Sequence, residues 1–149
     1  KMKKAKKTNQ ERVVIYALYN EEYDDYYNDH SDLLSIGIDK ERELKKYCEE
    51  KGYEILEVVR NGESNYIPYK LRHLLEVIYK YQTIHCPDEY IAKVDKVLIY
   101  DIYDLCSNVS EFNVIFEMFN FDHIEIETIK QGNISKNSFK ELEEKENEK

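Results

Sequence analysis

Two neighbouring residues, Cys106 and Ser107, are of the kinds that act as nucleophiles in covalent catalysis. They come shortly after the apolar run 97–100, which is typical of a buried strand, and open parallel sheets bind ligands beyond the carboxyl ends of their strands. A reactive thiol or hydroxyl needs a neighbouring base or cation to activate it. No His, Lys or Arg lies between Asp101 and Asn120, so the pattern favours a structural role for both residues.

A second group of chemically capable residues precedes that strand. His85, Cys86, Asp88 and Glu89 are metal-ligand types at close spacing, but a zinc site needs three or four ligands that meet in space, and no second cluster follows. The three cysteines are widely spaced and form no Cys-x-x-Cys motif, which argues against a disulfide framework. We therefore expect no metal site and no cofactor, and a reducing cytoplasm as the compartment.

The most unusual stretch is an acidic, tyrosine-rich segment that we expect to form a loop over residues 20–35. It lacks the Gly and the closing Glu of an EF-hand calcium loop. Tyrosine anchors protein interfaces at low entropic cost, and acids interleaved with tyrosine can imitate a phosphate strand towards a basic partner. A solvated loop, a protein-binding loop and a phosphate mimic remain open as interpretations. The interaction candidates are Tyr23, Asp24, Asp25, Tyr26 and Tyr27.

The overall charge restricts the classes of partner. The chain has 149 residues, with 22 basic and 31 acidic side chains, and a formal net charge of -9. That length supports one domain, and a hydrophobic content of 42% is too high for a disordered chain. The basic surplus is confined to the N-terminus, where we expect residues 1–11 to form a flexible basic arm. The acidic remainder argues against tight binding to a phosphate backbone, which requires Lys and Arg, and no apolar run is long enough to span a membrane.

Short apolar runs alternate with amphipathic segments over residues 12–131, which predicts buried strands alternating with helices. This order indicates a three-layer α/β domain with a mostly parallel sheet flanked by helices. The last strand alternates Ile with Glu and Thr, which is typical of a strand near an edge of the sheet with one wet face. Residues 132–149 are expected to form a polar, charged tail that frays or docks weakly. The expected strands are 13–18, 53–59, 94–102 and 124–129, and the expected helices are 38–51, one from Pro68, and 109–120.

Three separated segments also point to a known family. They are Arg12–Asn20, which contains Tyr16-Ala17; Glu43–Leu75, which contains Asn61-Gly62-Glu63-Ser64 and Leu74-Leu75; and Val97–Ile126, which contains Asp104-Leu105. Together and in this order they resemble the N-terminal catalytic domain of the serine site-specific recombinases, the resolvase and invertase family. The resemblance covers about residues 12–131 and implies a resolvase-like fold.

The catalytic motifs of that family are degenerate in this chain. In the family, a segment reading Tyr-Ala-Arg-x-Ser supplies the Ser that attacks the DNA phosphate, but here the Arg position is Leu18 and the Ser position is Asn20. An amide is not such a nucleophile, and Leu cannot stabilise phosphate charge. The next family Arg position falls on Pro68, and those of the motif Asp-Arg-Leu-x-Arg fall on Asp104 and Ser107. The resemblance therefore implies no catalytic residue in this chain.

These replacements predict a phosphate-gripping site that has become neutral or negative, and phosphoryl transfer depends on positioning and electrostatic stabilisation. A Gln that the family often places early in its first helix falls near Asp39 or Lys40. We expect a catalytically inactive, recombinase-like protein that acts through protein contacts. Its partner would be a recombinase, another DNA-processing protein or a second copy of itself, with DNA binding weak or absent.

Two alternatives stay open. The first is a functional recombinase with an atypical active site, in which arginines would converge on Ser31, Ser35 or Ser64 as the nucleophile. The second is a small-ligand-binding doubly wound domain, although the chain lacks the glycine-rich motifs that cradle nucleotide phosphates.

Overall fold

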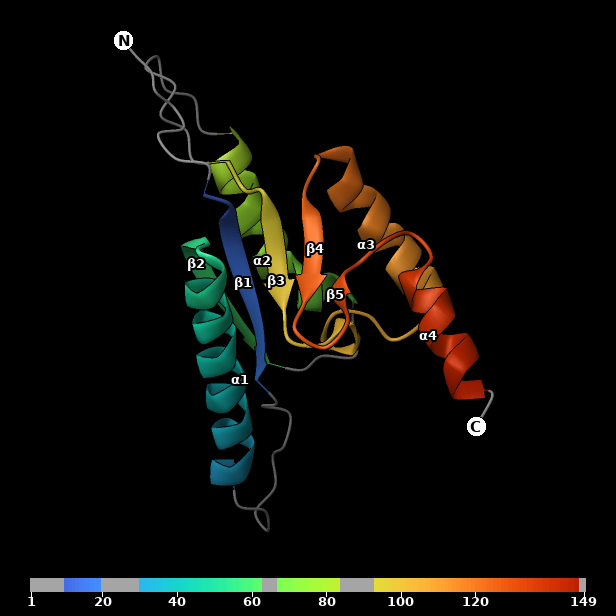
Figure 1. The fold of residues 1–149 in the computed structure, drawn as a ribbon, viewed down its shortest axis with the longest axis horizontal. Coiled ribbons are helices and arrows are strands. Elements are labelled where there is room, and N and C mark those ends of the chain that lie inside the picture. The colour runs from blue at the N-terminus through green and yellow to red at the C-terminus, as the bar shows by residue number, and fades with distance from the viewer. Residues whose placement is uncertain (1–9, 20–29, 63–66, 84–92, 148–149) are drawn as a thin grey trace.

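The chain folds around a five-stranded sheet (Figure 1). The computed structural model describes residues 10–19, 30–62, 67–83 and 93–147. In chain order the elements are β1 (Arg12–Tyr19), α1 (His30–Lys51), β2 (Glu54–Gly62), α2 (Ile67–Thr83), β3 (Lys96–Ile99), the short 3-10 helix η1 (Ile102–Asp104), α3 (Val109–Phe121), β4 (Glu125–Thr128), β5 (Gly132–Asn133) and α4 (Ser138–Asn147).

β1 lies inside the sheet because its β-branched and aromatic side chains are buried on both faces. Val13, Val14, Ile15 and Tyr16 have no exposed surface. The strand order is β2-β1-β3-β4-β5. β1 runs parallel to β2 and β3, and β3 runs parallel to β4. β5 pairs antiparallel with β4. The predicted α/β class and the mostly parallel sheet are confirmed.

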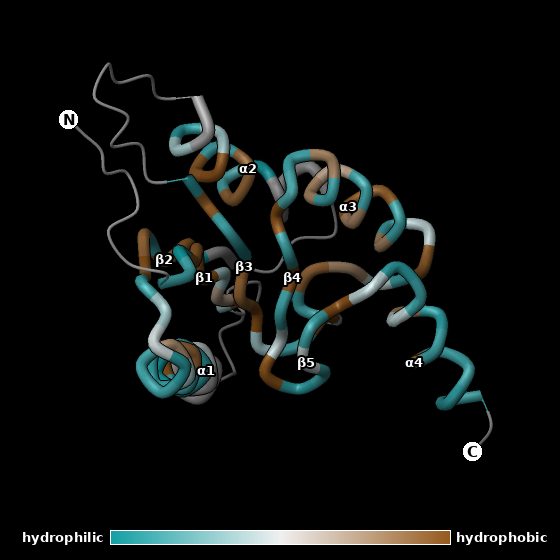
Figure 2. The backbone as a smooth tube through the Cα atoms, turned by 45° about the horizontal axis from the view of Figure 1, so that its top comes forward, coloured by the Kyte–Doolittle hydropathy of each residue, from teal (hydrophilic) through white to brown (hydrophobic). Residues whose placement is uncertain are grey.

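Helices cover both faces of the sheet, so the predicted three layers are confirmed. Odd-numbered residues of β1 pack against Leu44 and Cys48 of α1. Val14 and Tyr16 point the other way, into a larger core formed with α2, α3 and α4. Figure 2 shows α1 on one side of the strands and α2 and α3 on the other. Among the described residues, no helix is long and apolar enough to cross a membrane.

The first helix is longer than predicted. α1 begins at His30, whereas the sequence analysis began the helix at Ile38 and expected a loop over residues 20–35. Ser31, Asp32 and Gly37 disfavour a helix locally, but extending a helix that has already formed adds one hydrogen bond for each residue fixed. Residues 1–9 of the expected basic arm over residues 1–11 lie outside the described residues, as do the interaction candidates Tyr23 to Tyr27.

Two strand ends also differ from the prediction. β2 continues to Gly62 rather than ending at Val59, because its last residues pair with the end of β1. β3 ends at Ile99 rather than Ile102, because the Asp101 carboxylate accepts a hydrogen bond of 3.0 Å from the Tyr103 N–H and begins η1.

The expectation of a weakly docked C-terminal tail is wrong. Phe139 of α4 has no exposed surface, and Ile134 is 8% exposed. The Phe139 ring stacks on Phe112 of α3 at a centroid distance of 5.6 Å and meets the edge of Tyr103 at 5.1 Å. A single aromatic side chain therefore docks a helix that is otherwise mostly charged, because burying one ring removes a large apolar area from water.

β4 lies next to the edge strand β5, so its predicted place near an edge is confirmed, but the predicted wet face is wrong. β5 covers its outer edge, and Glu127 is only 3% exposed. The register explains the burial: Leu98 lies opposite Glu127, and Lys96 lies opposite Glu125, so that the side chains of Lys96 and Glu127 are on the α1 face of the sheet.

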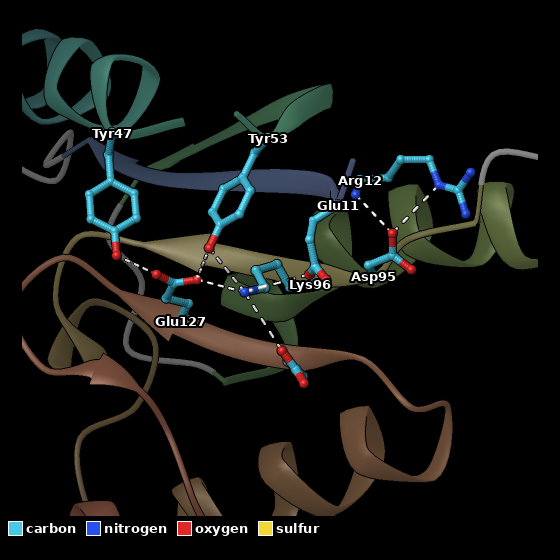
Figure 3. A network of polar contacts seen from close by, with 8 residues as sticks. Glu11, Arg12, Tyr47, Tyr53, Asp95, Lys96 and Glu127 are labelled. Atoms are coloured by element: carbon cyan, nitrogen blue, oxygen red, sulfur yellow. Dashed lines mark hydrogen bonds and ion pairs between the residues drawn. The ribbon is translucent and has the colours of Figure 1, made fainter. Parts of the chain in front are cut away.

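The buried charges of Lys96 and Glu127 form one network with two tyrosines (Figure 3). Lys96 Nζ lies 2.7 Å from Glu127 Oε1, the Tyr53 hydroxyl donates to the same oxygen at 2.7 Å, and the Tyr47 hydroxyl donates to Oε2. Burial alone would lower the pKa of Lys96 and raise that of Glu127, but these hydrogen bonds shift both pKa values in the opposite direction. Both groups therefore remain charged inside the protein.

We predict that Glu127→Ala destabilises the protein by about 3–5 kcal/mol, because it leaves the Lys96 ammonium buried without its main partner. Glu125→Ala on the same strand is the matched control. Its carboxylate is 3.6 Å from the same Nζ but 67% exposed, so its loss should cost less than about 1 kcal/mol. Urea unfolding of both variants measures the difference, and equal effects would contradict this account. Adding Lys96→Met to Glu127→Ala should restore part of the stability.

Candidate functional site

The carboxyl ends of β1, β2 and β3 meet at one edge of the sheet because the three strands are parallel. Tyr19 ends β1, Arg60 lies near the end of β2, and Asp104 follows β3 in η1. α1 contributes Lys40 and Glu41, whose side chains contact these residues. We call Tyr19, Lys40, Glu41, Arg60 and Asp104 the carboxyl edge.

Glu41 is the centre of the larger cluster at the carboxyl edge. The Tyr19 hydroxyl donates to Oε1 at 2.6 Å, and the Arg60 guanidinium holds both oxygens, with Nε and Nη2 each at 2.7 Å. Lys45 Nζ lies 2.9 Å from Oε2. The hydrogen bond from Arg60 is the main reason that the pKa of Glu41 falls to about 2. Glu41 is thus ionised at any ordinary pH and bound in the two-pronged geometry that makes Arg–carboxylate pairs strong.

Gly37 lets α1 approach the end of β1 closely enough for this cluster to form. A Cβ atom at Gly37 would lie 2.5 Å from the nearest atom of the Tyr19 ring. Any side chain there would push Tyr19 or the helix away, so the glycine is required by packing rather than by its backbone conformation. The close contact holds the Tyr19 hydroxyl within reach of Glu41.

A second ion pair lies at the same edge. Lys40 Nζ is 3.2 Å from each carboxylate oxygen of Asp104 and 5.4 Å from the ring centroid of Tyr100. Asp104 is 8% exposed. By the resemblance, Asp104 stands at a position where the recombinase family has an Arg, and Lys40 falls near the position of a family Gln. In this ion pair the acid lies in η1 and the cation lies on α1.

The sequence analysis did not identify Tyr19, Glu41 and Arg60 as members of one site. The spacing of Glu41 and Lys45 is visible in the sequence as an (i, i+4) ion pair. Nothing in the sequence, however, links the pair to Arg60 on a strand or to Tyr19 on another. Only the parallel pairing of β1 with β2 brings these side chains together.

The cluster around Glu41 carries an excess of positive charge. Arg42, Lys45 and Arg60 line an open hollow of about 360 Å³ beside Tyr19 and Glu41. Arg42 is paired with Asp39 at 2.7 Å, which leaves one cation in excess in this hollow. The expected neutral or negative site concerned the family's catalytic positions, and since Asn20 and residues 21–29 lie outside the described residues, that expectation stays a prediction. The cations are present, but their nearest partners are carboxylates.

The other residues at family catalytic positions lie on separate elements of the chain. Leu18 is partly buried against the core on the α2 and α3 side of the sheet. Ser107 is exposed, and its backbone N–H donates to Glu111 Oε1 at 2.7 Å near the start of α3. Pro68 lies in the first turn of α2, and Asn20 lies outside the described residues.

Neither cysteine in the described part of the chain is placed for nucleophilic chemistry. Cys106 is buried, and its thiol donates to the Ile102 carbonyl at 3.6 Å. Burial, and secondarily the charge of Glu127, raises the pKa of the Cys48 thiol to about 11. Residues 84–92, with the His85 to Glu89 candidates, lie outside the described residues, and no group of three metal-ligand side chains gathers among the residues that are described.

The four arginines of the chain lie on four different elements, each beside a carboxylate. The pairs are Arg12 with Asp95 at 3.6 Å, Arg42 with Asp39 at 2.7 Å, Arg60 with Glu41 at 2.7 Å, and Arg72 with Glu76 at 3.6 Å. An atypical recombinase site would bring several arginines around one serine. Arg42 and Arg60 line the same hollow, but the candidate serines Ser31, Ser35 and Ser64 are not among the described side chains, so that alternative stays a prediction.

Tyr19 is the remaining hydroxyl nucleophile at the carboxyl edge. Burial raises its pKa, and the hydrogen bond to Glu41 raises it further, so the phenol keeps its proton at neutral pH. The carboxyl edge therefore combines ion pairs with a protonated phenol. It can stabilise the contact between α1 and the sheet, but it holds no activated nucleophile.

We predict that the carboxyl edge contributes to stability in a pH-dependent way through Glu41. Its pKa in the folded protein, about 2, is below the ordinary value of 4.5, so its contribution is present above about pH 5 and is lost as the pH falls towards 2. Glu41→Gln should cost about 1.5–3 kcal/mol at pH 7 and much less near pH 2. Denaturant unfolding at several pH values gives the difference from the wild type. Asp39→Asn, in an exposed pair, should change stability by less than about 1 kcal/mol, and a Glu41→Gln effect independent of pH would contradict the prediction.

Comparison with known proteins gives a structural relative. No protein-family model matches the chain, and no curated protein sequence matches it. A solved structure that it resembles is that of a resolvase family site-specific recombinase from Streptococcus pneumoniae, with a TM-score of 0.65 and 13% sequence identity, over 93% of this chain and 89% of that one. At this identity the likeness concerns the fold. The chain has a resolvase-like α/β fold, as the resemblance in its sequence implied.

Proposed function

We propose that this chain is a recombinase-like protein that does not exchange DNA strands and acts through contacts with other proteins. The observation that supports this most is the pairing of cations at the carboxyl edge, Arg60 with Glu41 and Lys40 with Asp104. A strand-exchange site needs a nucleophile and cations that are free to stabilise the transferred phosphate. Here Nε and Nη2 of Arg60 and Nζ of Lys40 are already bound to carboxylates.

Electrostatics also opposes phosphate binding at this edge. A DNA phosphate that reached Arg60 or Lys40 would come within a few ångströms of an ionised carboxylate, and separating either pair would leave a largely buried acid without its partner. Leu18, at the family's Arg position, has no donor to offer instead.

We predict that the full chain forms no covalent adduct with DNA. Incubation with supercoiled plasmid, followed by denaturing electrophoresis, should give no protein–DNA band and no relaxed plasmid, while an active serine recombinase on its own site gives both. Asn20→Ser, which restores the family's nucleophile position, should remain inactive because Leu18, Asp104 and Ser107 still supply no arginine. An adduct that survives denaturation would overturn the claim of inactivity.

The proposed contact region is the acidic, tyrosine-rich segment around Tyr23, Asp24, Asp25, Tyr26 and Tyr27. Its support is its composition, since Tyr is among the residues that contribute most to protein interfaces. A basic protein partner, such as an active recombinase, has the complementary charge.

We predict that changing Tyr23, Tyr26 and Tyr27 together to Ser removes protein partners from an affinity capture with the full chain. Tyr79→Ser on α2 is the control, because Tyr79 is an exposed tyrosine, at 69%, outside this segment. Quantitative mass spectrometry compares the captured proteins. Identical partners for the triple variant and the wild type would remove this segment from the proposal.

A further inference from the structure

The outer face of α3 carries an apolar stripe that nothing in the described structure covers. Val114, Met118 and Phe121 are 59%, 40% and 83% exposed. Their spacing of four and then three residues places them on one side of the helix. The opposite side of the same helix is the buried one, formed by Phe112, Ile115 and Phe119.

The stripe is more than scattered surface hydrophobicity. Single exposed apolar residues are common on protein surfaces, but a contiguous row on a helix is typical of a binding face. Phe121 is a large aromatic side chain left almost entirely in water, which favours its burial by a partner. Beside it, an open hollow of about 580 Å³ is lined by Glu117, Met118, Asn120, Phe121 and Asp122.

Acidic side chains flank the stripe on both sides. Glu117 lies on one side, three and four residues from Val114 and Phe121; on the other side are Glu111, three residues from Val114, and the C-cap Asp122, four residues from Met118. No Lys or Arg occurs between Tyr100 and Ile129, so no basic residue of this region offsets the acids. The stripe is thus an apolar surface with a negative rim.

This charge pattern selects the partner. A second copy of the chain would bring the same face against itself about a twofold axis, so that Glu117 of one copy would face Glu117 of the other. The net charge of -9 adds to that repulsion. Nucleic acids and anionic membrane surfaces carry the same sign of charge as the rim and are disfavoured for the same reason.

We propose that the outer face of α3 binds an amphipathic helix of another protein, whose apolar side chains cover Val114, Met118 and Phe121 and whose Lys or Arg side chains meet Glu111, Glu117 and Asp122. Such binding of a helix against an apolar surface through residues three and four apart is a recurrent mode of recognition. The proposal rests on the proposed role in protein contacts and assigns it a surface separate from the acidic segment and from the carboxyl edge.

The test uses the full chain and synthetic helical peptides about 18 residues long, roughly five turns. One peptide has Leu on one face and Lys on the other, the second has the same composition in scrambled order, and the third keeps the Leu face but replaces Lys with Glu. Fluorescence anisotropy of labelled peptide measures binding. We expect the patterned Leu/Lys peptide to bind and both other peptides to bind at least about tenfold more weakly.

Variants of the protein locate the binding face. Phe121→Ser should weaken binding of the Leu/Lys peptide about tenfold, as expected for an aromatic side chain at the centre of a small interface. Glu117→Lys should weaken it as well, while Ile38→Ser, an exposed apolar position on α1 at 45%, should not. Because these side chains are exposed, the variants should keep the wild-type circular dichroism spectrum.

Three results would overturn the proposal. They are equal binding of the scrambled peptide, unchanged binding by Phe121→Ser, and a dimer in sedimentation experiments that Phe121→Ser converts to a monomer, which would assign the face to self-association. None of these measurements involves DNA. If the peptide test fails, the claim of recombinase inactivity still depends only on the adduct assay. If the adduct assay fails, the peptide result still stands.

Discussion

Helices cover the two faces of the mostly parallel sheet unequally, and the structure depends on how both faces are nevertheless shielded from water. In the described chain, α2, α3 and α4 share one face, and α1 alone covers the other. α1 packs over β1 and β2 and leaves the strands beyond them to be sealed differently. There, Tyr47 and Tyr53 reach across to Glu127, which is neutralised by Lys96. This polar network fills the part of the α1 face of the sheet that apolar side chains do not cover.

The position of α1 also determines the chemistry at the carboxyl edge. The contact of Gly37 with Tyr19 brings the helix against the end of β1, and the next turn then delivers Lys40 and Glu41 to Asp104 and Arg60. The fold is resolvase-like, but the cations at this edge are bound to acids that the chain itself supplies. The placement of this one helix therefore stabilises the fold and pairs Lys40 and Arg60 with acids of the chain.

The negative net charge acquires a definite distribution in the structure. Around Glu41 the edge has one cation in excess, so the acidity of the chain is not uniform over the sheet. The region from Asp101 to Ile129 has acids but no Lys or Arg, and α3 presents these acids beside exposed Met118 and Phe121. The two surfaces thus differ in charge: the carboxyl edge is closed by internal ion pairs, and the outer face of α3 combines acids with exposed apolar side chains.

The sequence by itself determined the fold class, because runs such as Val13 to Ala17 are apolar enough to require burial on both faces and alternate with amphipathic helices. The resemblance in the sequence also places Asn20 and Leu18 at the family's nucleophile and Arg positions, and this assignment stays a prediction. The tertiary structure decided which individual polar and aromatic residues are buried and which are ionised. Glu127 is buried because the strand register places it opposite Leu98. Phe139 is buried because its ring stacks on Phe112 of α3. Glu41 is ionised because Arg60 on β2 donates hydrogen bonds to it. Such contacts join residues far apart in the chain, and local pattern carries no information about which distant partner a side chain will meet.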